Sequence, residues 1–289
     1  MSRFWLSAAV VVSIGTMLMA QPPSKTRRLF VSVVDGSNAP VQNLTTADFQ
    51  VKENGVERTV VRAVLHQPLR LALMVDNSDG AAQAIAPLRT GVHAFLDAIP
   101  PEVEVILLTT GRQLRIRVPA TTDRKKLHDA VGIIYPDNGS PSVLLNGLSE
   151  VFNRFFRNVT DRFAAIVVVT TDGPENSNMN PKQFSQLADA FQARGVLFHG
   201  VVLSRRGVGM QSDALISLVQ NSSGHLDKLT VPNSLAERMK ALGEIVTKDA
   251  DWLSQQYEVE YENPLGSGAS LEVLMTRPGL RPTVSLARP

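Results

Sequence analysis

Two apolar runs, each followed by a short polar motif, decide the fold of this chain. The first run is Leu71-Ala-Leu-Met-Val75, and Asp76-Asn77-Ser78-Asp79-Gly80 follows it directly. The second extends from Ala164 to Thr170 and is followed by Thr171-Asp172-Gly173. Continuous apolar runs of this length are typical of strands buried on both faces, as in parallel sheets covered by helices. The sequence therefore predicts an α/β core around these two strands.

Helical patterns separate the apolar runs. Apolar residues recur at spacings of three and four in four stretches, which predict helices over roughly 85–99, 144–155, 184–191 and 235–253. Further strands are predicted at 103–108 and 196–203. In the stretch 114–118 apolar residues alternate with Arg115 and Arg117, so it is predicted to be an antiparallel edge strand. The fold class is a doubly wound, mostly parallel sheet with helices on both faces.

Both ends of the chain have strand patterns of a different kind. Residues 27–65 contain alternating apolar runs and an Asn54-Gly55 pair, which favours a tight hairpin turn. Residues 256–287 return to alternation, as in Tyr257, Val259 and Tyr261. Neither segment has enough strands to be stable alone, so we expect the two to pair into one small β-sandwich-like unit. The expected division is a signal peptide at 1–20, β segments at 27–65 and 256–287, and a central domain at 66–253.

Composition excludes several classes of protein. The chain of 289 residues has no cysteine, which removes disulfides, thiolate metal sites and cysteine nucleophiles. Its formal charge of +2 gives no basic surface of the kind that nucleic acid requires. One positive charge, an apolar stretch and a terminal Ala20 predict a signal peptide and export to the periplasm or the extracellular space. The alternative is an uncleaved segment, which would be the chain's one attachment to a membrane.

Polar residues gather where strands of the predicted sheet end. In open α/β sheets ligands bind beyond the carboxyl ends of the strands. Asp76 and Ser78 follow one strand, Asp172 follows another, and Ser142 stands at a loop-to-helix junction expected on the same edge. Carboxylate and hydroxyl oxygens without His or Cys suit a hard cation such as Mg²⁺. The alternative is that both aspartates only cap helices or accept hydrogen bonds from loop amides.

These motifs resemble the metal-ion-dependent adhesion site of von Willebrand factor type A domains. The resemblance covers residues 66–250, and the flanks 41–55 and 256–264 are similar to an exported bacterial group related to that family. It implies a non-enzymatic protein that binds another protein through a divalent cation held by Asp76, Ser78, Ser142 and Asp172. Gly80 stands where the family has a ligand serine, so the resemblance implies a weakened site that Gly80→Ser would tighten.

An enzyme is the main alternative function. The same acidic residues could support a metal-assisted hydrolase of phosphate or similar esters, although no nucleophile elbow or phosphate-binding loop is present. None of the five histidines is paired at i and i+4, and we expect His93 and His128 to face solvent and His199 to lie in the core. A third interpretation is a purely structural domain without an ion. Asp79 adds a carboxylate that would either assist a cation or face solvent.

Overall fold

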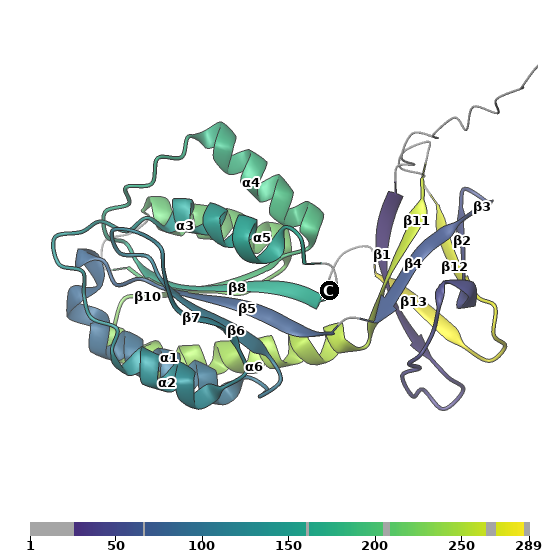
Figure 1. Cartoon of the computed structure of the whole chain (residues 1–289), viewed down its shortest axis with the longest axis horizontal. Helices are drawn as coiled ribbons and strands as arrows, with labels where there is room; N and C mark the ends of the chain where they lie inside the picture. The colour runs from purple at the N-terminus through teal and green to yellow at the C-terminus, as the bar shows by residue number, and fades with distance from the viewer. Residues whose placement is uncertain (1–25, 66, 160–161, 205–208, 264–269, 286–289) are drawn as a thin grey trace, which may run out of the picture.

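The computed structural model describes residues 26–285 except 66, 160–161, 205–208 and 264–269. The predicted signal peptide therefore lies outside the described residues. No helix in the described ranges has both the length and the apolar character needed to cross a bilayer. The chain forms a central α/β domain and a β unit beside it (Figure 1).

A six-stranded sheet forms the middle layer of the central domain, with the strand order β10-β9-β8-β5-β6-β7. The strands are β5 (Gln67–Val75), β6 (Glu104–Thr109), β7 (Arg115–Thr121), β8 (Arg162–Thr171), β9 (Leu197–Leu203) and β10 (Leu226–Leu229). All neighbouring strands are parallel except β7, which pairs antiparallel with β6 at one edge. The predicted fold class and its antiparallel edge strand are confirmed.

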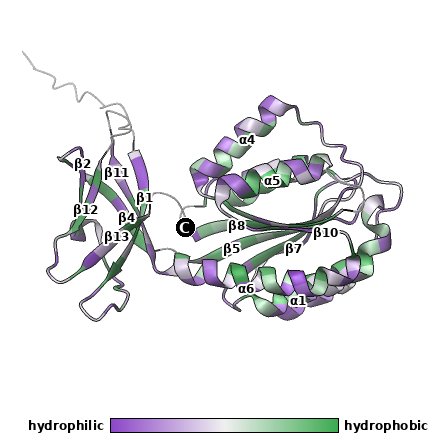
Figure 2. Ribbon diagram, turned by 180° about the vertical axis from the view of Figure 1, so that it is seen from behind, coloured by the Kyte–Doolittle hydropathy of each residue, from purple (hydrophilic) through white to green (hydrophobic). Residues whose placement is uncertain are grey.

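Helices cover both faces of this sheet. One face carries α1 (Ile85–Ala98), α2 (Arg124–Gly132) and α6 (Leu235–Ser254), and the other carries α3 (Leu144–Val151), α4 (Pro181–Arg194) and α5 (Met210–Ser222). Short helical turns lie at η2 (Asp79–Ala84), η3 (Phe152–Phe156) and η4 (Pro232–Ser234). In Figure 2 the strands of the sheet are hydrophobic, while the helices carry their polar residues on the outer side. Two apolar cores, one on each face, therefore hold the three layers together.

The β unit is built from both ends of the described chain. Its first sheet has the order β13-β1-β11-β4 and its second the order β12-β2-β3. The strands are β1 (Thr26–Val34), β2 (Phe49–Glu53), β3 (Val56–Arg58), β4 (Val60–Leu65), β11 (Gln256–Glu262), β12 (Leu271–Met275) and β13 (Arg281–Ser285). Because β1 lies between β11 and β13, the expected pairing of the two ends is confirmed. That the ranges 27–65, 66–253 and 256–287 fold as separate units stays a prediction.

Local chemistry explains the hairpin in this unit. Asn54 and Gly55 have φ values of 52° and 76°, the left-handed conformation that a two-residue hairpin turn requires. The turn pairs Glu53 with Val56 and so fixes the register of β2 and β3. The turn η1 (Thr46–Asp48) precedes β2.

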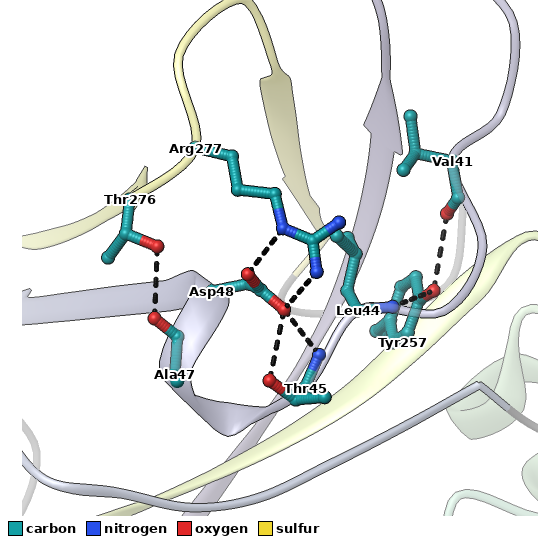
Figure 3. A network of polar contacts seen from close by, with 8 residues as sticks. All are labelled: Val41, Leu44, Thr45, Ala47, Asp48, Tyr257, Thr276 and Arg277. Atoms are coloured by element: carbon teal, nitrogen blue, oxygen red, sulfur yellow. Dashed lines mark hydrogen bonds and ion pairs between the residues drawn. The ribbon is translucent and has the colours of Figure 1, made fainter.

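Polar contacts also join the two ends (Figure 3). Arg277 donates to both carboxylate oxygens of Asp48, at 2.7 and 3.0 Å. The backbone N–H of Thr45 donates to the same carboxylate at 2.6 Å, and this bond and the Arg277 guanidinium hold the pKa of Asp48 below its ordinary value. The Tyr257 hydroxyl accepts from the Leu44 N–H and donates to the Val41 carbonyl. Segments about 200 residues apart in sequence are thus fixed to each other.

Candidate functional site

Three loops meet at the carboxyl edge of the six-stranded sheet, on the side turned away from the β unit (Figure 1). The loop after β5 contacts the loop after β8 through Asp76 and Thr171. It contacts the 133–143 loop where the Asp79 N–H donates to the Ser140 carbonyl at 2.9 Å. The Ser142 N–H in turn donates to the Pro174 carbonyl at 2.8 Å. The segments that carry the four predicted site residues therefore lie together.

The carboxylate of Asp76 holds the loops of this edge together by hydrogen bonds. Its side chain is buried, and one carboxylate oxygen accepts from the Ser78 N–H at 2.8 Å. The other accepts from the Thr171 hydroxyl at 2.6 Å and from the Thr171 N–H at 3.1 Å. These bonds fit the interpretation in which Asp76 accepts from loop amides. They also fix the position of Ser78, two residues further along.

Ser78 and Asp172 each present an oxygen that has no hydrogen-bond partner in the part of the chain that the structure describes. The Ser78 hydroxyl is fully buried, and within the described residues nothing bonds to it. Asp172 Oδ1 accepts from the Ser212 hydroxyl at 2.5 Å, whereas Oδ2 is buried and has no partner among the described residues. Buried polar atoms are normally hydrogen-bonded, so two such oxygens at one edge call for an explanation. A bound cation would provide one.

Ser142 is held chiefly through its backbone. It is fully buried, and its hydroxyl lies 3.4 Å from the Thr110 hydroxyl, which is a long hydrogen bond. Its carbonyl accepts from the Asn176 N–H at 2.8 Å. Glu175 reinforces this arrangement because its carboxylate accepts from the Leu144 N–H at the start of α3. Burial raises the pKa of the Glu175 carboxyl. The Ser142 hydroxyl thus remains available for a stronger partner.

Gly80 does not leave an open ligand position. A Cβ on Gly80 would lie 2.7 Å from Gly173 Cα and 3.1 Å from the Thr171 hydroxyl oxygen. Neither of these neighbours is the end of a long flexible side chain, so a serine would push the two loops apart. This packing opposes the expectation that Gly80→Ser would tighten the site, and that expectation stays a prediction. Gly80 is needed here for the close approach of two loops.

The oxygens at this edge fit a hard divalent cation with an incomplete protein shell. Within the described residues no three His, Cys, Asp or Glu side chains gather into a metal-holding group. The donors would be one free carboxylate oxygen and two hydroxyls, with Asp76 holding the loop. Mg²⁺ commonly keeps several waters and takes only one or two carboxylates from the protein. The residue types therefore fit such an ion.

Several contacts at the site have no signal in the sequence. Ser212 and Gln211 in the first turn of α5 hold the loop after β8, and Gln211 Nε2 donates to the Gly173 carbonyl at 3.2 Å. Glu175 and Thr110 lie against Ser142. Thr171, which donates to Asp76, is different, because its position directly after a predicted strand places it at the same edge as the aspartates.

The described histidines lie outside this edge. His93 and His128 are half-buried between α1 and α2, with their Nδ1 atoms 2.7 Å apart, so the expectation that they face solvent is wrong. Burial, and next the neighbouring ring, lower the pKa of His93. His199 is buried as expected, accepting from the His225 N–H and facing Asp249 at 3.2 Å.

The fold and this edge define a doubly wound α/β domain with an oxygen-lined site at the carboxyl ends of its strands. Solved structures place it more narrowly. A von Willebrand factor type A protein from Catenulispora acidiphila matches with a TM-score of 0.53 and 12% identity, over 80% of this chain and 52% of that chain. BatB from Bacteroides thetaiotaomicron matches with a TM-score of 0.51 and 14% identity, over 63% and 99%. Proximal thread matrix protein 1 from the mussel byssus matches with a TM-score of 0.51 and 14% identity, over 64% and 49%.

The central domain therefore has the fold of von Willebrand factor type A domains, as the sequence motifs predict. The chain spans about half the length of the Catenulispora and mussel proteins. No family model matches the sequence, and no curated protein matches it. Identities of 12–14% establish the fold, and the roles of the residues at the edge rest on their geometry.

Proposed function

We propose that the chain binds another protein at the carboxyl edge of its six-stranded sheet, through a divalent cation held by Asp76, Ser78, Ser142 and Asp172. The observation that carries the proposal is the pair of buried oxygens on Ser78 and Asp172 that have no hydrogen-bond partner among the described residues. A bound cation supplies positive charge that a carboxylate of the partner can join. The chain's own residues would fix the loops and exclude part of the ion's water.

The ion is tested by thermal unfolding with Mg²⁺ or Mn²⁺. An ion at ten times its Kd stabilises the folded state by about 1.4 kcal/mol. That corresponds to a rise of about 3–6 °C in Tm for a domain of this size. Asp172→Asn keeps the acceptor for Ser212 but removes the charge, so the rise should vanish. Asp251→Asn removes an exposed charge on α6 and should leave the rise unchanged. An unmoved Tm in the natural chain would eliminate the ion.

Protein binding is tested by crosslinking from the edge itself. The side chain of Tyr135 is 63% exposed, and its carbonyl accepts from Asn77 Nδ2 at 3.0 Å, so it lies beside the candidate site. A photoreactive residue at 135 should crosslink to a protein of the organism that makes this chain, and Asp172→Asn should abolish the adduct. The same residue at exposed Val61 in β4 is the matched control. Equal adducts from both positions would contradict the proposal.

An enzymatic role has less support. In the described residues no three His, Cys, Asp or Glu side chains form a group that could hold a metal, and a hydrolase needs a nucleophile or general base close to its metal. We expect no turnover of p-nitrophenyl phosphate or p-nitrophenyl acetate with Mg²⁺ or Mn²⁺. Sustained hydrolysis that Asp172→Asn abolishes would make the metal-assisted hydrolase the better proposal.

Export is part of the proposal. The segment 1–20 has the charge, apolar core and small terminal residue of a signal peptide, which would place the binding in the periplasm or outside the cell. N-terminal sequencing of the protein from its source should give Gln21 as the first residue. An intact Met1 in the membrane fraction would instead indicate an uncleaved anchor.

A further inference from the structure

A cavity of about 330 Å³ opens beside the candidate ion site. It lies between the turn η2, the loop after β8, the end of β9 and the start of η4. Its lining consists of two carboxylates, four small or polar residues of the adjoining loops and three apolar residues: Asp79, Gly80, Gln83, Ala84, Thr171, Asp172, Gly173, Leu203 and Pro232. This volume is within the range of pockets that hold a small group.

The described residues that line the cavity combine negatively charged carboxylates with apolar side chains. Asp79 is exposed, and its Oδ1 accepts only a backbone N–H, that of Gly139 at 3.0 Å, among the bonds of the described residues. Asp172 contributes a carboxylate with one buried oxygen that has no partner among the described residues. No Lys, Arg or His is among the described residues that line the cavity. Leu203, Ala84 and Pro232 supply apolar walls, so an anion is disfavoured and a cation on an aliphatic stem is favoured.

Large apolar side chains flank this cavity on the surface. Val231 is 52% exposed and directly precedes Pro232 in the lining. Met210 is 62% exposed and directly follows Gly209, where an added Cβ would lie 3.1 Å from Asp172 Oδ1. Exposed apolar side chains around a pocket are typical of protein interaction sites. The occupant is therefore expected to arrive as part of a protein.

The charge on the other side of the site has the opposite sign. Near Ser140, Arg112 and Arg115 both approach Asp137, at 3.3 and 4.0 Å, so two guanidinium groups share one carboxylate. Arg112 also donates to the Ser140 hydroxyl at 3.0 Å. Among the described residues, the edge is thus divided into a positive half on the Ser142 side and a negative half at the cavity. A partner that binds across it needs a basic group over the cavity.

We propose that this cavity receives a lysine or arginine side chain of the protein partner, with the cationic head beside Asp79 and Asp172 and the stem against Leu203 and Pro232. The inference rests on the proposed function for its location at the binding edge. Asp172 belongs both to this cavity and to the predicted ligand set, whereas Asp79 belongs to the cavity alone, so Asp79 is the residue that tests the cavity apart from the ion. It adds a specificity contact that favours partners with a basic residue near the contact point.

The test uses single-residue probes and the purified chain. Nα-acetyl-lysine methylamide is titrated against the ¹⁵N-labelled protein in EDTA, and Nα-acetyl-norleucine methylamide, which lacks the charged head, is the matched probe. The lysine probe should shift the backbone amides of 79–84 and 171–173, and the norleucine probe should shift them much less. Asp79→Asn, which keeps an acceptor for the Gly139 N–H, should weaken the lysine probe about tenfold. Asp251→Asn should have no effect.

Each outcome decides the inference. Equal shifts with both probes, no shifts with the lysine probe, or an unchanged affinity in Asp79→Asn would overturn it. Because the titration is done in EDTA, its result is separate from that of the ion experiment. If the lysine probe binds and neither Mg²⁺ nor Mn²⁺ changes the Tm, the cavity proposal stands and the ion proposal fails. If the ions raise the Tm and the lysine probe does not bind, the ion proposal stands and the cavity proposal fails.

Discussion

The contact between Gly80 and Gly173 leads to a testable prediction for Gly80→Ser. The sequence resemblance implies that this variant binds the ion more tightly, whereas the packing implies that it is less stable. Gly80→Ser would add the ligand hydroxyl that the sequence resemblance implies for this position. It would also place a Cβ 2.7 Å from Gly173 Cα, where carbon atoms normally rest 3.5–4.0 Å apart. The two loops must then separate by about 1 Å. That movement breaks the approach that Asp76 and Thr171 maintain by hydrogen bonds.

The expected cost follows from overpacking in other proteins. Inserting a side chain into a closed contact typically costs about 1–3 kcal/mol. For a domain of this size the loss corresponds to a fall of about 2–12 °C in Tm. The assay is thermal or urea unfolding of Gly80→Ser, with Gly132→Ser as control. An added Cβ on Gly132 meets nothing within 4 Å, so that variant should change stability by less than about 0.5 kcal/mol.

A second variant approaches the same contact from the other side. A Cβ on Gly173 would lie 3.0 Å from Gly80 Cα, so Gly173→Ala should also destabilise the domain. Because either change separates the same loops, the two costs should not add in the double variant. A Gly80→Ser protein as stable as the natural chain, with a larger Tm rise in Mn²⁺, would refute this reasoning. The serine would then be a working ligand.

Two further predictions concern the β unit. In Asp48→Asn the charge that the Thr45 N–H stabilises is lost, so the variant should be less stable by about 1–3 kcal/mol at pH 7. Since folding lowers the pKa of Asp48, its contribution is full above the ordinary carboxyl pKa and is lost as pH falls through the lower folded value. Urea unfolding at pH 7 and pH 3 should therefore show a smaller difference at pH 3, and an equal difference would contradict the linkage. Tyr257→Phe leaves the Leu44 N–H and the Val41 carbonyl without the hydroxyl and should cost about 1–2 kcal/mol in the same assay, whereas an unchanged midpoint would show that water replaces it.

The sequence predicts much of the fold because its strongest patterns coincide with buried elements. The apolar runs ending at Val75 and Thr170 correspond to β5 and β8, neighbours at the centre of the sheet, where most side chains are buried and apolar. Elements at the surface are less predictable. Strand β10 (Leu226–Leu229) was not anticipated, since its Asp-Lys pair gives no strand pattern and pairing with β9 fixes it. The residues after the Asn54-Gly55 turn have a strand pattern without a break, but the structure divides them at Thr59, because β3 and β4 belong to different sheets.

The candidate site likewise has residues that the sequence predicts and contacts that it does not. Asp76, Ser78 and Asp172 could be predicted because they directly follow strands whose carboxyl ends must share one edge. The contacts that Ser212 and Glu175 make could not, since they depend on how helices pack against the loops. The close packing of Gly80 against Gly173 could not be predicted either, because the spacing of residues in the sequence does not give the distance between the two loops.

The different roles of the two aspartates decide which variants can separate binding from folding. Asp76 accepts one bond within its own loop, from the Ser78 N–H, and two from Thr171 that join the loop to β8, so Asp76→Ala would leave buried donors unpaired and disturb the edge with or without an ion. Loss of function in Asp76→Ala would therefore not show whether Asp76 binds an ion or only holds the loops in place. Asp172 has one oxygen occupied by Ser212 and one without a described partner. Asp172→Asn keeps the first interaction and removes the charge that both an ion and a basic side chain in the cavity would need, so its effect has to be compared with that of Asp79→Asn, which lies in the cavity alone.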